Sequence, residues 1–456
     1  MFLMVSDSLS LAISRFLTYS IGKDDEIKRN SVFCSTIIVQ LALIILFIVI
    51  AETLGLWFFN NKLNIPADRV NASMAVYQLS IVSFCINLIS VPYNAVIVAH
   101  EKMSAFAFIS LYEASMKLAI VFILSLTSVD KLVMFAILSC IIGLSVRMIY
   151  GLYCKRNFNE CKFHFIFERN TLSELLKFSG WNFLGTSTVI LRVQGGNILL
   201  NIFFGPAVNA AKGISNQVNS MLHSFVANFM TALNPQIIKS FANNETQHMN
   251  DLMLYGAKFS CFIMILLSTP FIIDIDYILR LWLGNAPEHS ALFLRLIIIY
   301  TLFETLSVPI ATGIIATGKI KYYEITTSCV ELLNLPLAYI LFRLGFFPEI
   351  ITIVFIIIAQ FTLMIRLYFI HNATGFSIME YLKDVYLRCV IVAVTSCLAP
   401  FIAYNLMACS FIRLVIICLA SWLSSCLLIY FWGCQKKERE IINGRVKQIY
   451  LKFKLI

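Results

Sequence analysis

Long apolar segments separated by short polar connections run through the whole chain. The segment Ile37–Ile50 is typical, because it is almost wholly apolar and continues so on both sides. About 20 residues of helix are needed to cross the roughly 30 Å hydrocarbon core of a bilayer. The pattern predicts about thirteen helices, the first short and polar, over 2–21, 31–59, 71–99, 104–127, 129–153, 178–204, 206–234, 251–274, 290–317, 320–345, 348–371, 384–407 and 410–433.

The composition supports a membrane protein. Hydrophobic residues make up 59% of the 456 residues and charged residues 13%, whereas soluble domains carry about 25% charged residues. We therefore predict an all-α polytopic membrane protein, with a soluble helical solenoid as the alternative. The thirteen cysteines lie mostly in apolar segments and are expected to be small buried residues, not disulfides.

No chemistry-bearing motif stands out. Cys154, Cys161 and His164 share a loop but lack a fourth ligand and the usual zinc spacing. The chain shows no nucleotide-binding motif, so we expect no catalytic residues, no metal site and no enzyme.

Basic residues are distributed unevenly between alternate connections, and this sets the orientation. If the C-terminal tail is cytoplasmic, the loops on its side hold Lys23, Lys28, Arg29, Lys102, Lys155, Arg156, Lys162, Arg169, Lys239, Lys319, Lys321 and Lys383. The opposite loops hold Lys62, Arg69, Lys131, Arg280 and Arg413. We predict a cytoplasmic C-terminus, and we attribute the net charge of +10 to topology, not to nucleic-acid binding.

The N-terminus then falls on the far side of the membrane. Thirteen crossings with a cytoplasmic tail place Met1 outside, yet no basic or cleavable leader precedes the first apolar segment. One more helix upstream would restore a cytoplasmic start. We therefore expect that a first helix is missing from this chain.

The two halves of the chain repeat each other. "SVPYNAVIVAHEKM" (Ser90–Met103) is similar to "SVPIATGIIATGKI" (Ser307–Ile320) at an offset of 217 residues. A similar offset pairs Glu113 with Glu331. Once a short insertion around Lys62–Arg69 is allowed, "LGLWFFNN" pairs with "LRLWLGNA", which aligns Trp57 with Trp282. Six helices separate the copies, so the halves should share one orientation and be related by an axis along the membrane normal.

The repeat gives a domain organisation. We predict an incomplete N-lobe of about five helices over 1–153, a cytoplasmic linker over 154–177 and a six-helix C-lobe over 178–371. Two additional helices follow over 372–433, then a basic cytoplasmic tail over 434–456.

One predicted membrane helix, 206–234, is unexpectedly polar. On a helical wheel its amides, Lys212 and His223 fall on one side, and apolar residues fill about 120° to 240°, with Ser215 as the main exception. Lipid cannot satisfy buried polar groups, so this face must contact protein or a water-filled cavity. We favour a substrate cavity over interhelical hydrogen bonding alone, lined by Arg15, Arg192, Gln194, Asn197, Lys212, Asn216, Asn219 and His223.

Other ionisable residues fall within predicted spans. Such groups cost roughly 2.5–3.5 kcal/mol each on insertion scales and usually mark a pathway. Glu113, Glu304 and Glu331 are the candidates for ion coupling by H⁺ or Na⁺, and no other cofactor is expected. Glu113 and Lys117 can also neutralise each other at i, i+4. Arg15, Arg147 and Arg366 are the arginines for which the alternative, reaching the membrane surface from a helix end, is favoured.

Strings along the chain resemble a known family. "SRFLTYSIGK", "RVQGGNILLNIFFG" and "GISNQVNS…NFMTALNPQIIKSFA" are similar to the polysaccharide-transporter branch of the MATE-like multidrug/oligosaccharidyl-lipid/polysaccharide (MOP) exporter superfamily, which includes O-antigen (Wzx-type) flippases. The resemblance covers nearly the whole chain from Ser14. It implies two six-helix lobes plus two C-terminal helices, fourteen in all, so this chain departs from the pattern by lacking the first.

The resemblance also implies a function. Members translocate undecaprenyl-pyrophosphate-linked oligosaccharides across a bacterial inner membrane for surface polysaccharide such as O-antigen, capsule or exopolysaccharide. The expected partners are the lipid-linked oligosaccharide, membrane lipids and polysaccharide polymerase or assembly proteins, with no nucleic acid. The alternatives are a cation-coupled drug or metabolite antiporter of the same fold, and a non-transporting scaffold of a polysaccharide-assembly complex.

Overall fold

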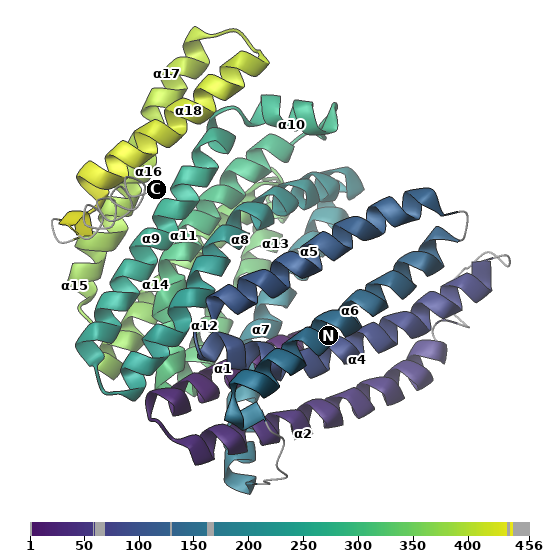
Figure 1. Ribbon diagram of the computed structural model, residues 1–456. Coiled ribbons are helices and arrows are strands. Elements are labelled where there is room, and N and C mark those ends of the chain that lie inside the picture. The colour runs from purple at the N-terminus through teal and green to yellow at the C-terminus, as the bar shows by residue number, and fades with distance from the viewer. Residues whose placement is uncertain are drawn as a thin grey trace, which may run out of the picture. The chain divides into compact units, whose positions relative to one another are not determined.

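The computed structural model describes residues 2–57, 59, 69–127, 130–161, 168–435 and 438–440, with side chains from residue 9 onward in the first helix. Within these residues all regular structure is helical (Figure 1). Lys62, Lys162, His164 and the tail from residue 441 lie outside the described residues.

The helices follow the predicted segments closely. Their bounds are α1 (Phe2–Gly22), α2 (Glu26–Ile50), α4 (Val70–Ala99), α5 (Met103–Leu126), α6 (Lys131–Asn157), α7 (Arg169–Phe204), α8 (Pro206–Ala242), α9 (Thr246–Ile273), α10 (Ile275–Leu283), α11 (Ser290–Thr317), α12 (Lys321–Leu332), α13 (Asn334–Arg343), α14 (Ile350–Thr374), α15 (Ile378–Tyr381), α16 (Arg388–Ser396), α17 (Leu398–Leu406) and α18 (Phe411–Leu428). Short turns of other helix types are η1 (Ala51–Gly55), η3 (Asn159–Cys161), η4 (Leu382–Leu387) and η5 (Ile429–Gly433).

Within the described residues, 11 helices are long and apolar enough to cross a membrane. Their spans start at Glu26, Val70, Met103, Lys131, Arg169, Thr246, Ser290, Lys321, Ile350, Ile378 and Phe411. The predicted all-α polytopic membrane fold is confirmed. The helices α1 and α8 are long but fall outside this set, and α8 is the helix whose sequence carries the polar stripe.

Local sequence explains where helices begin and break. Asp25 begins α2 by accepting a hydrogen bond from the Lys28 amide at 2.9 Å, and Ser410 caps α18 in the same way. The predicted helix 320–345 is interrupted after Leu332, four residues before Pro336. The same break occurs four residues before Pro400, where α16 ends. A proline ring clashes with the carbonyl four residues earlier, which accounts for both breaks.

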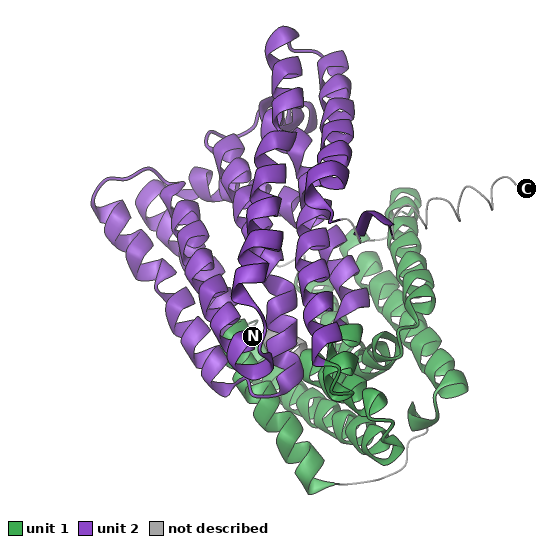
Figure 2. Cartoon of the chain, turned by 90° about the vertical axis from the view of Figure 1, so that its left-hand side faces the viewer, with its two compact units in different colours: residues 1–186, 235–245 green, residues 187–234, 246–456 purple. Residues whose placement is uncertain are grey.

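The chain divides into two compact units (Figure 2). Unit 1 comprises 1–186 and 235–245, and unit 2 comprises 187–234 and 246–456. Both divisions fall inside helices, so α7 and α8 each contribute to both units. The linker predicted over 154–177 contains the end of α6, the turn η3 and the start of α7.

The same packing scheme occurs in each unit. In unit 1, α4 packs on α6, and in unit 2, α11 packs on α14. The prolines matched by the sequence repeat, Pro92 and Pro309, lie in α4 and α11 respectively. The packing of the helices thus follows the repeat seen in the sequence.

Two buried ion pairs within unit 2 join α9 and the residue after it to α18 and to the residues that follow η5. At one end of α9, the Asp274 carboxylate accepts two hydrogen bonds from Arg413, at 2.7 and 3.1 Å. Toward the other end, the Lys258 ammonium lies 2.9 Å from the Glu438 carboxylate, and both side chains are 3% exposed. We had placed Arg413 among the loop charges. This was wrong, because its side chain is buried against Asp274 and the Tyr404 ring.

Candidate functional site

The polar helix α8 has one face buried in the core of unit 2 and another that is exposed or half-buried. Val218, Leu222, Val226 and Met230 are buried in a core with residues of α9, α10 and α11. Gln217, Ser220, Ser224 and Asn228 are exposed, and Asn216, Asn219 and His223 are half-buried. The helix therefore packs one apolar face into unit 2, as predicted, although Met221 and Phe225 of the predicted apolar face are exposed.

Ser215, the exception to the helical pattern, is satisfied inside the protein. Its hydroxyl lies 2.9 Å from the Ala211 carbonyl and 3.0 Å from the Ser290 carbonyl at the start of α11. A buried serine is tolerated on an apolar face when its hydroxyl finds such partners.

The centre of the site is formed by Arg192 on α7 and Lys212 on α8. Both are buried, with 7% and 3% of the residue exposed. The Arg192 guanidinium lies 5.2 Å, and the Lys212 ammonium 5.4 Å, from the centre of the same Phe355 ring. Two cations from neighbouring helices thus converge on one aromatic side chain.

Their hydrogen bonds are incomplete. Arg192 Nη1 donates to the Tyr300 hydroxyl at 2.7 Å, but Arg192 Nε has no hydrogen-bond partner. The Lys212 ammonium has none either. Among the described residues, neither side chain forms an ion pair within 4 Å.

Glycine makes the close approach of the lysine possible. A Cβ atom at Gly196 would lie 3.2 Å from Lys212 Nζ and 3.1 Å from the Ile351 side chain. Because position 196 has no side chain, the ammonium reaches the backbone of α7. At the neighbouring Gly195, a Cβ atom would meet the Leu335 side chain at 2.7 Å, so both glycines allow close packing against α7.

A second cluster of charged and polar residues lies around Arg366 in the same unit. Arg366 Nη1 donates to the Ser307 hydroxyl at 2.5 Å and interacts electrostatically with Tyr323 and Glu331. Arg366 lies well inside α14, so our expectation that it extends to the membrane surface from a helix end was wrong. Glu304 and Glu331 act electrostatically on both Arg192 and Arg366, and buried Glu324 acts on Arg366.

The remaining predicted residues have varied surroundings. In unit 2, Gln194 is exposed and Asn197 is half-buried. In unit 1, Arg15 is buried, with its guanidinium 4.7 Å from the Phe16 ring centre and 5.5 Å from that of Phe178. Glu113 forms its ion pair with Lys117 at 2.6 Å, as the i, i+4 spacing predicts.

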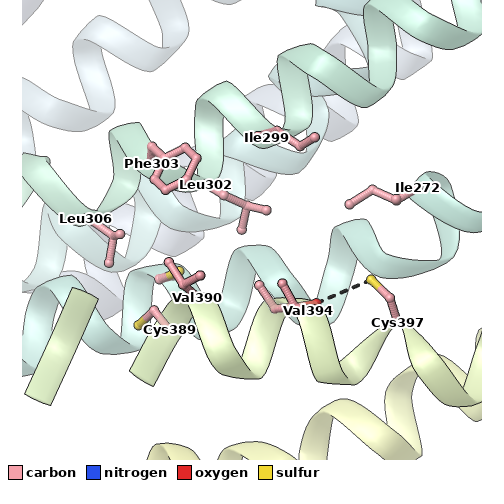
Figure 3. A pocket seen from close by; sticks show the side chains of 11 residues that line it. Ile272, Ile299, Leu302, Phe303, Leu306, Cys389, Val390, Val394 and Cys397 are labelled. Atoms are coloured by element: carbon pink, nitrogen blue, oxygen red, sulfur yellow. Dashed lines mark hydrogen bonds between the residues drawn. The ribbon is translucent and has the colours of Figure 1, made fainter. Parts of the chain in front are cut away.

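An apolar pocket lies beside this cluster on the same helix α11. Its volume is about 390 Å³, and it is lined by Cys261 and Ile272 of α9, by Ile299, Leu302, Phe303 and Leu306 of α11, and by Cys389, Val390, Ala393, Val394 and Cys397 of α16. Figure 3 shows the α11 side chains directed toward those of α16.

Helix α11 separates a polar face from an apolar one. Tyr300, Glu304 and Ser307 recur at spacings of three and four residues and meet the arginines. The residues of α11 that line the pocket follow the same helical spacing. They lie on a face roughly a third of a turn away from the face that carries Tyr300, Glu304 and Ser307. The two environments therefore adjoin across one helix.

Sequence reasoning missed the partners of the cations. Tyr300, Phe355 and Glu324 lie in apolar or helix-start segments and look like ordinary core or surface residues. The repeat did carry one signal: the first-half counterpart of Glu304 is Asn87, so the carboxylate at 304 is peculiar to the second half. Among the described residues, no three His, Cys, Asp or Glu side chains are grouped to hold a metal ion.

Among the described residues, eleven apolar spans and a buried polar cluster indicate a multi-pass helical membrane protein. The family model named MatE matches residues 196–340, which include Lys212 and Tyr300. No curated protein matches the chain in sequence.

Solved structures of MATE transporters share the fold. A MATE protein in its straight conformation matches with a TM-score of 0.69 at 12% identity, over 82% of this chain and 85% of that chain. An outward-facing multidrug resistance MATE family transporter of the MOP superfamily matches with a TM-score of 0.72 at 11% identity, over 82% and 84%. A MOP superfamily transporter from Pyrococcus furiosus, described as having a binding pocket of reverse polarity, matches with a TM-score of 0.69 at 12% identity, over 84% and 86%.

The fold is therefore that of the MATE transporters. The match of residues 196–340 to the MatE family model agrees with this fold.

Proposed function

We propose that this protein is a flippase for lipid-linked oligosaccharides that carry a pyrophosphate group. The observation that carries the proposal is the pair of buried cations, Arg192 and Lys212, with unused donors and no ion-pair partner among the described residues. A buried charge is retained only where something compensates it. An anionic substrate group is the compensation that a transporter can receive and release.

The hydrogen-bond donors of Arg192 and Lys212 suit the phosphate group of a larger substrate better than they suit a small inorganic ion alone. Arginine offers a planar fork of donors that matches phosphate oxygens, and lysine adds a mobile point charge. Exposed and half-buried amides follow along α7 and α8, including Gln194, Asn197, Asn216 and Asn219. Amides both donate and accept, so they suit sugar hydroxyls with little choice among sugars.

The apolar pocket supports a substrate with a hydrocarbon chain. It lies against the polar cluster across α11 and is lined by aliphatic, aromatic and cysteine side chains. Each CH₂ group buried there would contribute about 0.8 kcal/mol. A polar head group at Arg192 and a lipid chain in the pocket would use both faces of α11 at once.

The proposed cycle is alternating access of the two lobes, with no covalent chemistry. The protein would act in the bacterial inner membrane with a cytoplasmic C-terminus, and would deliver its substrate to the polymerase or assembly proteins of surface polysaccharide.

The direct test reconstitutes the full chain in liposomes with a fluorescent undecaprenyl-pyrophosphate oligosaccharide. We expect the protein to accelerate loss of fluorescence when a membrane-impermeant quencher is added, because flipped lipid reaches the outer leaflet. In cells, depletion should leave the lipid-linked sugar on the cytoplasmic leaflet. A flipping rate equal to that of protein-free liposomes would contradict the proposal.

A second candidate is a cation-coupled antiporter of drugs or metabolites, which the fold accommodates equally well. The carboxylates Glu304, Glu324 and Glu331 favour it, since a cationic drug would bind carboxylates. Each of them lies within electrostatic reach of Arg366, however, and Glu304 and Glu331 also act on Arg192, so the arginines offset part of their charge. In a drug-resistance assay, a cationic substrate should be exported better after Arg192→Ala, whereas an anionic substrate should be exported worse.

We expect Glu304→Gln to reduce coupling to the ion gradient while leaving the protein folded. Glu304 acts electrostatically on Arg192 and Arg366, so its charge would change with a bound proton or cation during the cycle. The measurement is the transport rate with and without a proton or sodium gradient. Glu380→Gln is the control, because Glu380 is an exposed residue of α15 that is not among the coupling candidates. Transport that keeps its full gradient dependence in Glu304→Gln would remove this residue from the coupling site.

A further inference from the structure

A polar pocket at the end of unit 2 has no role in the function proposed above. It lies around α10 and the loop that leads to α11, with a volume of about 340 Å³. Its polar lining consists of Asp276, Arg280, Asn285, Glu288 and His289. Arg280, in the last turn of α10, belongs to the set of basic residues that the charge distribution predicts on the side opposite the cytoplasmic tail.

One lining residue is held in an unusual conformation. His289 has a positive φ of 71°, in the left-handed region that only a few per cent of non-glycine residues adopt, histidine more often than most. Its ring Nδ1 lies 2.6 Å from the carboxylate of Glu349, which is 2% exposed. Strained residues fixed by a buried partner are typical of ligand-binding positions. The Glu349 contact fixes the imidazole and leaves Nε2 as the nitrogen available to a ligand.

The internal repeat indicates that a side chain at the position of Arg280 is not required by the fold. The strings "LGLWFFNN" and "LRLWLGNA" align Gly55 with Arg280. In unit 1, a Cβ atom at Gly55 would fall 2.1 Å from the Tyr77 hydroxyl, so no side chain fits there. The first half therefore has no room for a side chain at this position, and the charge of Arg280 is specific to the second half.

The chemistry of the lining points to one class of ligand. Arg280 donates, the Asp276 and Glu288 carboxylates accept, and Asn285 and His289 can do either. The charges of the arginine and the acids largely offset each other, which disfavours a small ion. Among the described residues these side chains are also not grouped as a metal site. A sugar, which carries neutral hydroxyls that both donate and accept, matches this set.

We propose that this pocket binds a sugar of the translocated glycan on the side of the membrane where the glycan is released. The proposal rests on the flippase function, because it assigns to the pocket a part of that substrate. Asp276 is partly engaged by Arg295, at 3.0 Å, so Arg280, Asn285, Glu288 and His289 provide most of the free hydrogen-bonding groups. A sugar bound in this pocket would delay the return of the glycan to the site formed by Arg192 and Lys212.

The test measures sugar binding to the full chain in lipid nanodiscs by saturation-transfer NMR, with methyl glycosides of glucose, galactose and N-acetylglucosamine as probes. We expect saturable binding of at least one glycoside. Asn285→Ala with Glu288→Ala should weaken it by about tenfold or more, since each lost hydrogen bond contributes about threefold to tenfold. Both residues are exposed, so the protein should still fold.

The matched control is Asn372→Ala with Glu380→Ala, two exposed residues of α14 and α15 outside the pocket lining, which should bind like the wild type. A wild-type protein that binds no glycoside, or a double variant that binds as tightly as the control, would overturn the sugar pocket. This holds even if lipid-linked oligosaccharide is flipped. Sugar binding with no flipping in liposomes would instead overturn the flippase function and leave the pocket as a sugar site.

Discussion

Replacing Lys258 with Met should release the C-terminal end of η5 and the segment after it from α9. The Lys258 ammonium and the Glu438 carboxylate are both 3% exposed and lie 2.9 Å apart. The Gln435 amide adds a hydrogen bond to the second Glu438 oxygen, at 2.6 Å. Removing one partner leaves the other charge buried alone, which costs roughly 3–5 kcal/mol. Undocking of the segment avoids that cost, so undocking is the expected response.

Cys434 reports on this change. It is fully buried and within electrostatic reach of both Lys258 and Glu438, and burial, followed by the Glu438 charge, raises the pKa of its thiol. Because the thiolate is the reactive form, maleimide should label Cys434 slowly in the wild type. Labelling at Cys434, quantified by mass spectrometry of the purified protein, should increase severalfold in Lys258→Met.

Two controls make this result interpretable. Lys383→Met removes an exposed lysine of the same unit and should leave the labelling unchanged. The double variant Lys258→Met with Glu438→Leu removes both charges and should restore slow labelling, because replacing a whole buried pair by apolar residues is often neutral or stabilising. Slow labelling in Lys258→Met alone would show that the pair does not hold this segment in place.

The helices were predictable from sequence because each apolar run is long and bounded by polar caps such as Asp25 and Ser410. What the periodicity did not predict is α10, which has only nine residues and follows α9 after a single residue. A short amphipathic helix between two spans leaves too few turns for a pattern to emerge. The tertiary ion pairs were also invisible, since Lys258 and Glu438 are 180 residues apart.

The candidate site was predicted in part. The helical wheel placed Lys212 on the polar arc, and the structure brings it and Arg192 to one aromatic ring. The ring itself, Phe355, was not predicted, because nothing in an apolar helix distinguishes a phenylalanine that contacts a cation from one that contacts lipid. The expectation that Arg366 extends to the membrane surface was wrong, because the sequence cannot show that Ser307 on another helix accepts its hydrogen bond.

The pair Arg192 and Lys212 allows transport and stability to be separated. Arg192→Ala should abolish surface glycan while the protein still reaches the membrane, because it removes the donor fork proposed to bind pyrophosphate. Arg192→Lys should keep part of the activity, since charge matters more than the fork for a mobile substrate. Asn219→Ala should be less harmful than either, because amides contribute little choice among sugars. Wild-type glycan from Arg192→Ala would leave the flippase proposal resting on family resemblance alone.

Lys212→Met is the sharper variant. If Lys212 had only a structural role, loss of its ammonium would destabilise the protein. Here the ammonium is 3% exposed and has no hydrogen-bond partner, so methionine of similar length should stabilise the protein, by about 1–3 kcal/mol. We therefore expect a higher melting temperature in detergent together with loss of most surface glycan, normalised to membrane protein. Lys383→Met, at an exposed position, should change neither. A Lys212→Met protein that melts lower, or that exports glycan like the wild type, would show that the unpaired ammonium of Lys212 does not bind an anionic substrate.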